Sequence, residues 1–182
     1  MPLRRAPVVL AAILAAAIGL IVVIWPLGSP PGATRSGLLG RDAPSLAIDG
    51  RPPPSLDGSA IDLQTMRGRV VWLNFWTTTC VPCRTEMPAM QRLVEQYADE
   101  GLIIVGIDVG EGADSVGAFV DELGVRYPIV LDFDSAIFNR YSPLFGVPRH
   151  YFVDRGGTIA AARIGELRPA EMEPLITELL AD

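Results

Sequence analysis

The sequence predicts an α/β domain in which a mixed central sheet carries helices on both faces. Short apolar, β-prone runs alternate with longer amphipathic stretches, turn residues separate them, and no segment repeats. In chain order we expect a strand at 70–76, a helix at 81–100, a strand at 102–109, a helix at 114–123, a strand at 128–131, a helix at 135–141, strands at 151–153 and 158–163, and a helix at 169–180.

The first strand and helix have the strongest patterns. The run VVWLNFW at 70–76 is apolar at nearly every position, which is typical of a strand covered on both faces. The next stretch places Met87, Met90 and Tyr97 at helical spacing, and Gly101 closes it.

The later elements continue the alternation. The run LIIVGIDV at 102–109 predicts a second buried strand, and the helix after it has an acidic start at Asp114 and ends before Gly124. The turn 155–157 joins the last two strands as a hairpin, and Pro169 fits the first turn of the closing helix.

The N-terminal segment predicts a membrane anchor. Residues 8–25 carry no charge, and a helix of this length spans ~27 Å, enough for a bilayer core. Arg4 and Arg5 precede it, so the N-terminus is expected in the cytoplasm, with Trp25 at the far interface. A cleaved signal peptide and a buried soluble helix are the alternatives, although PLGSPPG is a poor cleavage site.

The chain therefore divides into a signal anchor at 1–28, a linker rich in Pro, Gly and Ser at 29–41, and a folded domain at 42–182. The domain is expected to begin with a short β-hairpin extension at 43–63, where Asp57-Gly58 is a hairpin-type turn. The expected location is the cell membrane, crossed once, with the folded domain outside the cytoplasm.

Composition excludes several classes of function. A formal charge of −6, from 15 basic and 21 acidic residues, argues against nucleic-acid binding, which needs a basic surface. Two cysteines cannot build a disulfide-rich scaffold or a four-cysteine zinc site, and one histidine excludes a multi-histidine metal centre.

Cys80 and Cys83 directly follow the first predicted strand, where a helix begins. The unpaired N–H groups and partial positive charge of a first helical turn favour a thiolate. Cys80 is expected to be the exposed nucleophile and Cys83, one turn into the helix, the shielded resolving thiol. A redox-active pair is the favoured interpretation. The alternatives are half of a zinc site completed by His150 and a carboxylate, a structural disulfide, and copper handling.

These residues resemble the thioredoxin superfamily, and within it the membrane-anchored TlpA/ResA-like thiol–disulfide oxidoreductases. WLNFW-TTT-CVPC-RTEMP matches the strand, active site and helix of that family, with Pro88 as the proline that kinks the helix. Val147-Pro148 matches the cis-proline loop that lies opposite the disulfide. The similarity covers 42–166 and implies a thioredoxin-like fold, a redox-active disulfide between Cys80 and Cys83, and neither a cofactor nor a metal.

The resemblance also implies roles for individual residues. Glu86 matches an active-site glutamate of this branch. Its position one turn after Cys83 favours proton exchange with the resolving thiol, and a solvated helix carboxylate is the alternative. Asn74 stands where thioredoxin has a buried aspartate and is expected to be hydrogen-bonded within the sheet, and Trp76 is expected to be core. The predicted catalytic residues are Cys80, Cys83 and Glu86, and the predicted substrate-binding residues are Val147, Pro148, Arg149 and Thr79.

The sequence departs from the family pattern on both sides of the site. Thr79 stands where a tryptophan usually precedes the first cysteine, which would open the client groove. Arg149 and His150 stand where two hydroxyl residues usually follow the cis-proline. Arg149 is expected to lower the pKa of Cys80 or to select acidic clients, and His150 is either a buried structural histidine or an acid–base group.

The function implied is that of a membrane-tethered, extracytoplasmic oxidoreductase that reduces client disulfides, in cytochrome c maturation or another envelope redox pathway. The expected partners are disulfide-bearing client proteins and a membrane electron donor such as a CcdA/DsbD-like thiol transporter, with no nucleic acid. Two alternatives on the same fold are a thiol peroxidase, since Thr77-x-x-Cys80 matches part of the peroxiredoxin pattern, and a Cu(I) chaperone that uses both cysteines and His150.

Overall fold

The computed structural model describes residues 37–142 and 146–182. The predicted anchor at 1–28 and most of the linker therefore lie outside the described residues. Within the described ranges, no helix combines the length and the apolar character that a membrane crossing requires.

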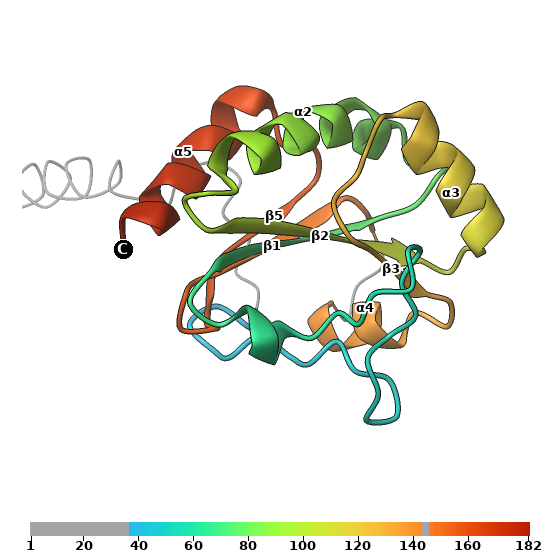
Figure 1. The fold of residues 1–182 in the computed structure, drawn as a ribbon, viewed down its shortest axis with the longest axis horizontal. Helices are drawn as coiled ribbons and strands as arrows, with labels where there is room; N and C mark the ends of the chain where they lie inside the picture. Colours follow the sequence, from blue (N-terminus) through green and yellow to red (C-terminus); the bar gives the residue numbers. More distant parts are fainter. Residues whose placement is uncertain (1–36, 143–145) are drawn as a thin grey trace, which may run out of the picture. The chain divides into compact units, whose positions relative to one another are not determined.

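A five-stranded sheet in the order β3-β2-β1-β4-β5 forms the centre of the domain (Figure 1). β1 (Val70–Trp76) pairs in parallel with β2 (Leu102–Val109), which pairs in parallel with β3 (Ile129–Asp132). On the other side, β4 (Arg149–Val153) is antiparallel to β1, and β5 (Ile159–Ile164) is antiparallel to β4. The predicted mixed sheet is confirmed.

Helices cover both faces of this sheet, as predicted (Figure 1). α2 (Val81–Tyr97), α3 (Ala113–Glu122) and α5 (Pro169–Ala181) pack on one face. α4 (Ala136–Tyr141) packs on the other, where the short 3₁₀ helix η2 (Leu63–Met66) also lies.

β1 supplies both hydrophobic cores because its side chains alternate between the two faces. Trp72 and Trp76 pack into the core under α2, whereas Leu73 and Phe75 pack into the core over α4. All seven residues of β1 are buried, which explains why its sequence reads as one apolar run.

The order of the elements from β1 onward is the predicted one, with small shifts at their ends. The helix expected to reach residue 100 ends at Tyr97, and the chain turns at Gly101, whose φ of 108° suits glycine. β4 begins two residues earlier than predicted, so that Arg149 and His150 are strand residues.

The hairpin extension expected at 43–63 is reduced to one antiparallel bridge, between Ile48 and Arg51, and contains no regular strand. The segment makes isolated bridges instead of strands, and one of them joins Ser55 to Val130 in β3. Three consecutive prolines that end at Pro54 have no N–H to donate to a hairpin ladder, but the Pro54 carbonyl accepts from Leu131 N at 2.9 Å. The segment therefore pairs with the β3 edge of the sheet, an edge that would otherwise be open.

Gly106 of β2 should be intolerant of a side chain. A Cβ added there would lie 2.6 Å from Ile129 Cδ1 and 3.0 Å from Trp76 Nε1. We expect Gly106→Ala to lower the free energy of unfolding by about 1–3 kcal/mol. Gly117→Ala, in α3, meets only Leu56 Cδ1 at 3.8 Å and should raise it by roughly 0.5–1 kcal/mol. Urea denaturation of both variants checks this, and equal losses would contradict it.

Candidate active site

The two cysteines stand at the junction of β1 and α2 and form a disulfide with Cα atoms 5.3 Å apart. Cys80 is the N-cap of α2, and its Sγ accepts a hydrogen bond from Cys83 N at 3.2 Å. Pro82 lies in the first turn, where its missing N–H is not needed. Cys83 is fully buried, whereas Cys80 is partly exposed. A partner molecule can therefore reach the sulfur of Cys80 and not that of Cys83.

The loop that precedes β4 reaches the same edge of the sheet. The peptide bond between Val147 and Pro148 is cis, as the resemblance implied, and β4 begins at the next residue. Because Arg149 pairs with Phe75 near the end of β1, this loop lies at the edge that carries the disulfide. Val147 and Cys80 pack, both partly buried, against the same core cluster.

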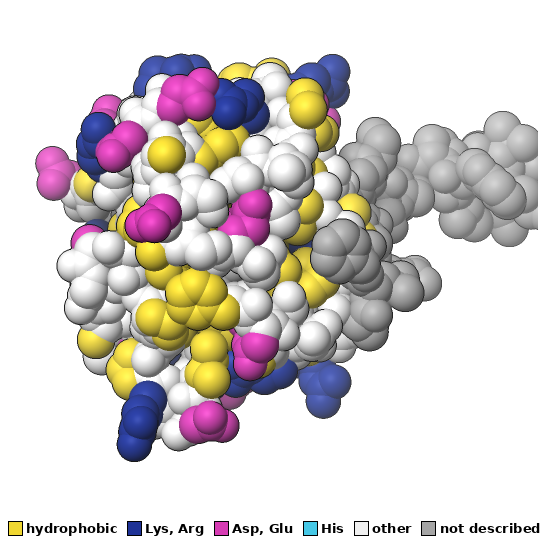
Figure 2. All heavy atoms as spheres, turned by 90° about the vertical axis from the view of Figure 1, so that its right-hand side faces the viewer, with side chains coloured by type: hydrophobic (Ala, Val, Ile, Leu, Met, Phe, Trp, Pro, Cys, Tyr) yellow, Lys and Arg dark blue, Asp and Glu magenta, His cyan; other side chains and the backbone are white. Residues whose placement is uncertain are grey.

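Apolar side chains are exposed at this edge. Val81, between the two cysteines, is 74% exposed, Phe133 after β3 is 53% exposed, and Ile164 at the end of β5 is 45% exposed. Figure 2 shows the face on this side of the molecule, where hydrophobic side chains gather near the centre and acidic side chains are scattered around them. The site therefore offers a partner an apolar surface, with charged side chains of both signs around it.

A buried polar cluster lies beneath α2. Asn74 of β1 faces His150 of β4 in the sheet register, and its Nδ2 lies 3.2 Å from His150 Nδ1 and 3.3 Å from Glu86 Oε1. Trp72 Nε1 donates to His150 Nδ1 at 3.2 Å, and Leu167 N donates to Glu86 Oε2 at 3.0 Å. These contacts join α2, β1, β4 and the segment before α5 through side chains that are almost fully buried.

The hydrogen bonds of this cluster determine its protonation. Because His150 Nδ1 accepts from Trp72, the ring proton is on Nε2, which faces Gly165 O at 3.2 Å and Glu86 Oε1 at 3.5 Å. Burial lowers the pKa of His150 to about 3, so the imidazole is neutral. Burial raises the pKa of Glu86 to about 8, against the opposing effect of its hydrogen bonds from Leu167 and Asn74. This pKa lies close to that of an ordinary thiol, about 8.5.

The remaining predicted contact residues occupy different positions. Arg149 is only 7% exposed, because strand alternation turns it to the α4 face, away from His150. Its Nε donates to Gly146 O at 2.8 Å, and its guanidinium lies 5.9 Å from the Phe138 ring centroid. Thr79 is exposed beside Cys80. The contact of Arg149 with clients stays a prediction, now for a mostly buried side chain.

Three residues next to the cysteines were missed by the sequence reasoning. Thr78, two residues before Cys80, is bound by the carboxylate of Glu111, which follows β2. Asp108, the last but one residue of β2, is completely buried and accepts from Glu111 N at 3.1 Å. The sequence did contain a signal for these residues, because Asp108 is an acid inside the otherwise apolar run 102–109. The carboxyl ends of the parallel strands β1 and β2 meet at one edge of the sheet, so an acid near the end of this run faces the same edge as the cysteines.

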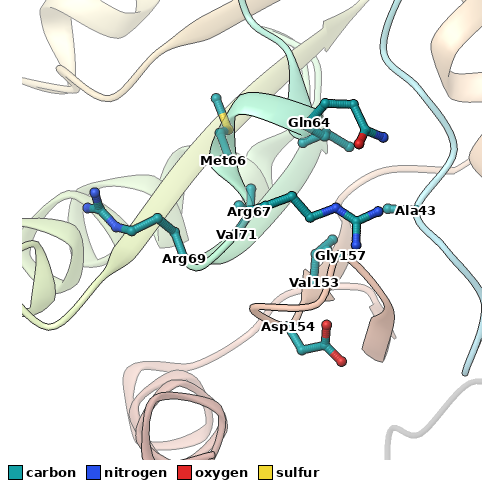
Figure 3. Close-up of a pocket in the computed structure, with 10 residues that line it drawn as sticks. Ala43, Gln64, Met66, Arg67, Arg69, Val71, Val153, Asp154 and Gly157 are labelled. Carbon is teal, nitrogen blue, oxygen red and sulfur yellow. The ribbon is translucent and has the colours of Figure 1, made fainter.

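The metal-binding alternatives gain no support from the part of the chain that the structure describes. No three His, Cys, Asp or Glu side chains group there in a way that could hold a metal ion, and His150 is engaged in the buried cluster. A small pocket lies at the opposite end of the sheet, by the start of β1 and the turn between β4 and β5 (Figure 3). It is lined by residues such as Arg67, Asp154 and Gly157 and contains no cysteine.

Comparison with known proteins places this geometry among thiol–disulfide proteins. The model of the AhpC/TSA family matches residues 39–162. The thiol-disulfide oxidoreductase ResA of Bacillus anthracis is 30% identical over 141 residues, which cover 78% of each chain. ResA of Bacillus subtilis (strain 168) is 32% identical over 130 residues, or 70% of this chain and 68% of that protein. A thiol:disulfide interchange protein of the thioredoxin family from Chlorobium tepidum TLS superposes with a TM-score of 0.63 at 26% identity, covering 74% of this chain and 99% of that one.

The raised pKa of Glu86 predicts a pH-dependent stability. The folded protein holds this proton up to a pH of about 8 and the unfolded chain only to about 4.5, so the free energy of unfolding falls as pH rises between these values. Glu86→Gln should reduce this fall by roughly 1–3 kcal/mol in urea denaturation of the oxidised protein. Asp108, whose pKa burial also raises to about 8, keeps part of the slope.

Glu95→Gln is the matched control, since Glu95 is an exposed carboxylate on the same helix. It should leave the dependence on pH unchanged. Parallel curves for the wild type and Glu86→Gln would show that Glu86 titrates alike in the folded and unfolded chains, which contradicts the account of the buried cluster.

Proposed function

Since this chain belongs to the AhpC/TSA family and is a thiol–disulfide oxidoreductase of the ResA type, we propose that it reduces the disulfide bonds of client proteins through Cys80 and Cys83. The observation that carries the proposal is the unequal exposure of the two sulfurs at the N-terminus of α2. The accessible sulfur of Cys80 attacks the client disulfide, and the buried sulfur of Cys83 then resolves the mixed disulfide.

The reaction has two exchange steps. The Cys80 thiolate attacks one sulfur of the client disulfide, and the other client sulfur leaves as a thiolate that takes up a proton. Cys83 then loses its proton and attacks Cys80 Sγ, which restores the Cys80–Cys83 disulfide and releases the second client thiol. Two electrons pass from the dithiol to the client. The N-terminus of α2 lowers the free energy of the Cys80 thiolate, which is the attacking group of the first step.

In its ionised form, the minor one at neutral pH because burial raises its pKa to about 8, Glu86 takes the proton from Cys83 in this scheme. Cys83 is shielded from water, so its deprotonation needs a group within the protein. Glu86 lies one turn further along α2, is itself buried, and has a pKa raised by burial to about 8, close to that of a thiol. Asn74, an amide, cannot serve as a base and instead holds Glu86 Oε1.

The client binds along the edge that carries the cis peptide bond. In this proposal Val147 and Pro148 of the cis-proline loop contact the client, Thr79 leaves the approach to Cys80 open, and the exposed Val81 provides apolar contact. Arg149 is paired with Phe75 and Ile164 and turned to the other face of the sheet, so its contribution is to support the cis-proline loop through its hydrogen bond to Gly146 O.

The location proposed is the outer face of the cell membrane, with residues 1–28 as the anchor. The dithiol must be regenerated after each turnover, so a membrane thiol transporter of the CcdA/DsbD type would carry electrons from the cytoplasm. Cytochrome c maturation is one envelope pathway that needs such a reductase.

Replacement of each cysteine should separate the two steps. Cys80→Ser should lower the rate of client reduction at least ~10³-fold, because the only accessible sulfur is lost. Cys83→Ser should still attack and should accumulate a mixed disulfide with the client, seen as a mass increase that dithiothreitol reverses. Thr85→Ser, on the exposed side of α2, is the control and should leave both readouts unchanged.

Turnover retained in Cys80→Ser, or no trapped adduct with Cys83→Ser, would contradict this assignment. Consumption of hydrogen peroxide by the reduced chain, faster than its reduction of any protein disulfide, would instead favour the thiol peroxidase alternative.

A further inference from the structure

The loop between β1 and the disulfide is held by a carboxylate from the segment that follows β2. Glu111 follows β2, and its two oxygens accept from the backbone N–H and from the hydroxyl of Thr78, the latter at 2.6 Å. Both carboxylate oxygens of Glu111 are therefore hydrogen-bonded to one residue of the loop, Thr78. Such a paired contact fixes orientation as well as distance.

Asp108 fixes Glu111 in turn. Asp108 is completely buried, stands opposite Trp76 in the β1–β2 register, and accepts from Glu111 N at 3.1 Å. Burial, followed by the neighbouring Glu111 carboxylate, raises the pKa of Asp108 to about 8. Burial opposes ionisation of Glu111 too, but hydrogen bonds from Asp108 and Thr78 outweigh it and lower the pKa of Glu111. Asp108 is thus the neutral anchor, and Glu111 is the ionised group that faces the loop.

The held residue lies within one turn of the nucleophile. Cys80 N donates to Thr77 O at 3.2 Å, so the segment 77–80 is a tight turn whose orientation determines where Cys80 Sγ lies as the cap of α2. Residues 77–79 are all threonines, and none of them is buried. Since residues 77–79 have no apolar side chain packed in the core, the two hydrogen bonds that Thr78 donates to Glu111 tie this part of the turn to the segment after β2.

We propose that Glu111 is a positioning residue for Cys80, holding the turn through Thr78 while Asp108 anchors Glu111 to the end of β2. The inference rests on the proposed function, because it assigns Glu111 a part in the reactivity of the nucleophilic thiol. Glu111 itself touches neither the sulfur nor the client. Its effect is to keep Sγ at the helix N-terminus, where the thiolate is stabilised and accessible.

Matched substitutions at Thr78 and Glu111 test the proposal in the reduced full-length chain, purified in detergent. Thr78→Val removes the hydroxyl at nearly constant shape, whereas Thr78→Ser keeps it. Glu111→Ala removes both acceptors, whereas Glu111→Gln can still accept from Thr78 N and donate to its hydroxyl. Asp114→Asn removes an exposed charge three residues further on and serves as the control.

The readout is the second-order rate constant for attack by Cys80 on the small aromatic disulfide DTNB, with the melting temperature measured on the same samples. We expect Thr78→Val and Glu111→Ala to react about tenfold more slowly than the wild type. Thr78→Ser, Glu111→Gln and Asp114→Asn should stay within about threefold of it.

Wild-type rates in both Thr78→Val and Glu111→Ala would overturn the inference while leaving the proposed function intact. Rates that fall only in proportion to the melting temperature, with no rescue by Ser or Gln, would overturn it as well, because the contact would then be merely structural. A wild-type chain that fails to react with the disulfide at all would instead remove the proposed function.

Discussion

The junction between β1 and α2 is the constraint on which the rest of the structure depends. β1 is the central strand, buried along its whole length and paired on both edges, so its end is held in place. α2 begins directly after the turn that follows, which places Cys80 at the helix N-terminus and Cys83 under its first turn. Thiolate stability, accessibility of one sulfur and burial of the other all follow from this junction.

Two clusters of buried polar side chains lie on the face of the sheet that α2 covers, and each contains a carboxyl group with a raised pKa. Glu86, Asn74 and His150 form one cluster near the cis-proline side, and Asp108 forms another with Glu111 at the end of β2. In each cluster burial raises the pKa of one carboxyl to about 8. Two acids are thereby kept protonated at neutral pH within the core that also holds the resolving cysteine, where proton and electron transfer have to be coupled.

Local patterns in the chain were sufficient to predict the order of strands and helices and the position of the cysteines between them. Contacts between distant segments were not predictable in this way. The segment 43–63 pairs with β3, and with itself only at the Ile48–Arg51 bridge. Glu86 meets His150 only because β4 pairs with β1 in one register. The same register turns Arg149 to the opposite face of the sheet. The hydrogen bonds between Glu111 and the active-site turn depend in the same way on the alignment of β1 with β2.

The measurement that tests the central claim most directly is the reduction potential of the Cys80–Cys83 couple. The full-length chain would be equilibrated with dithiol buffers of graded potential, and its oxidised fraction counted by alkylation and mass. The assignment as a client reductase predicts a reversible couple at or below about −230 mV. A potential above about −180 mV would make the protein an oxidant or isomerase, and the absence of a reversible couple would contradict the account altogether.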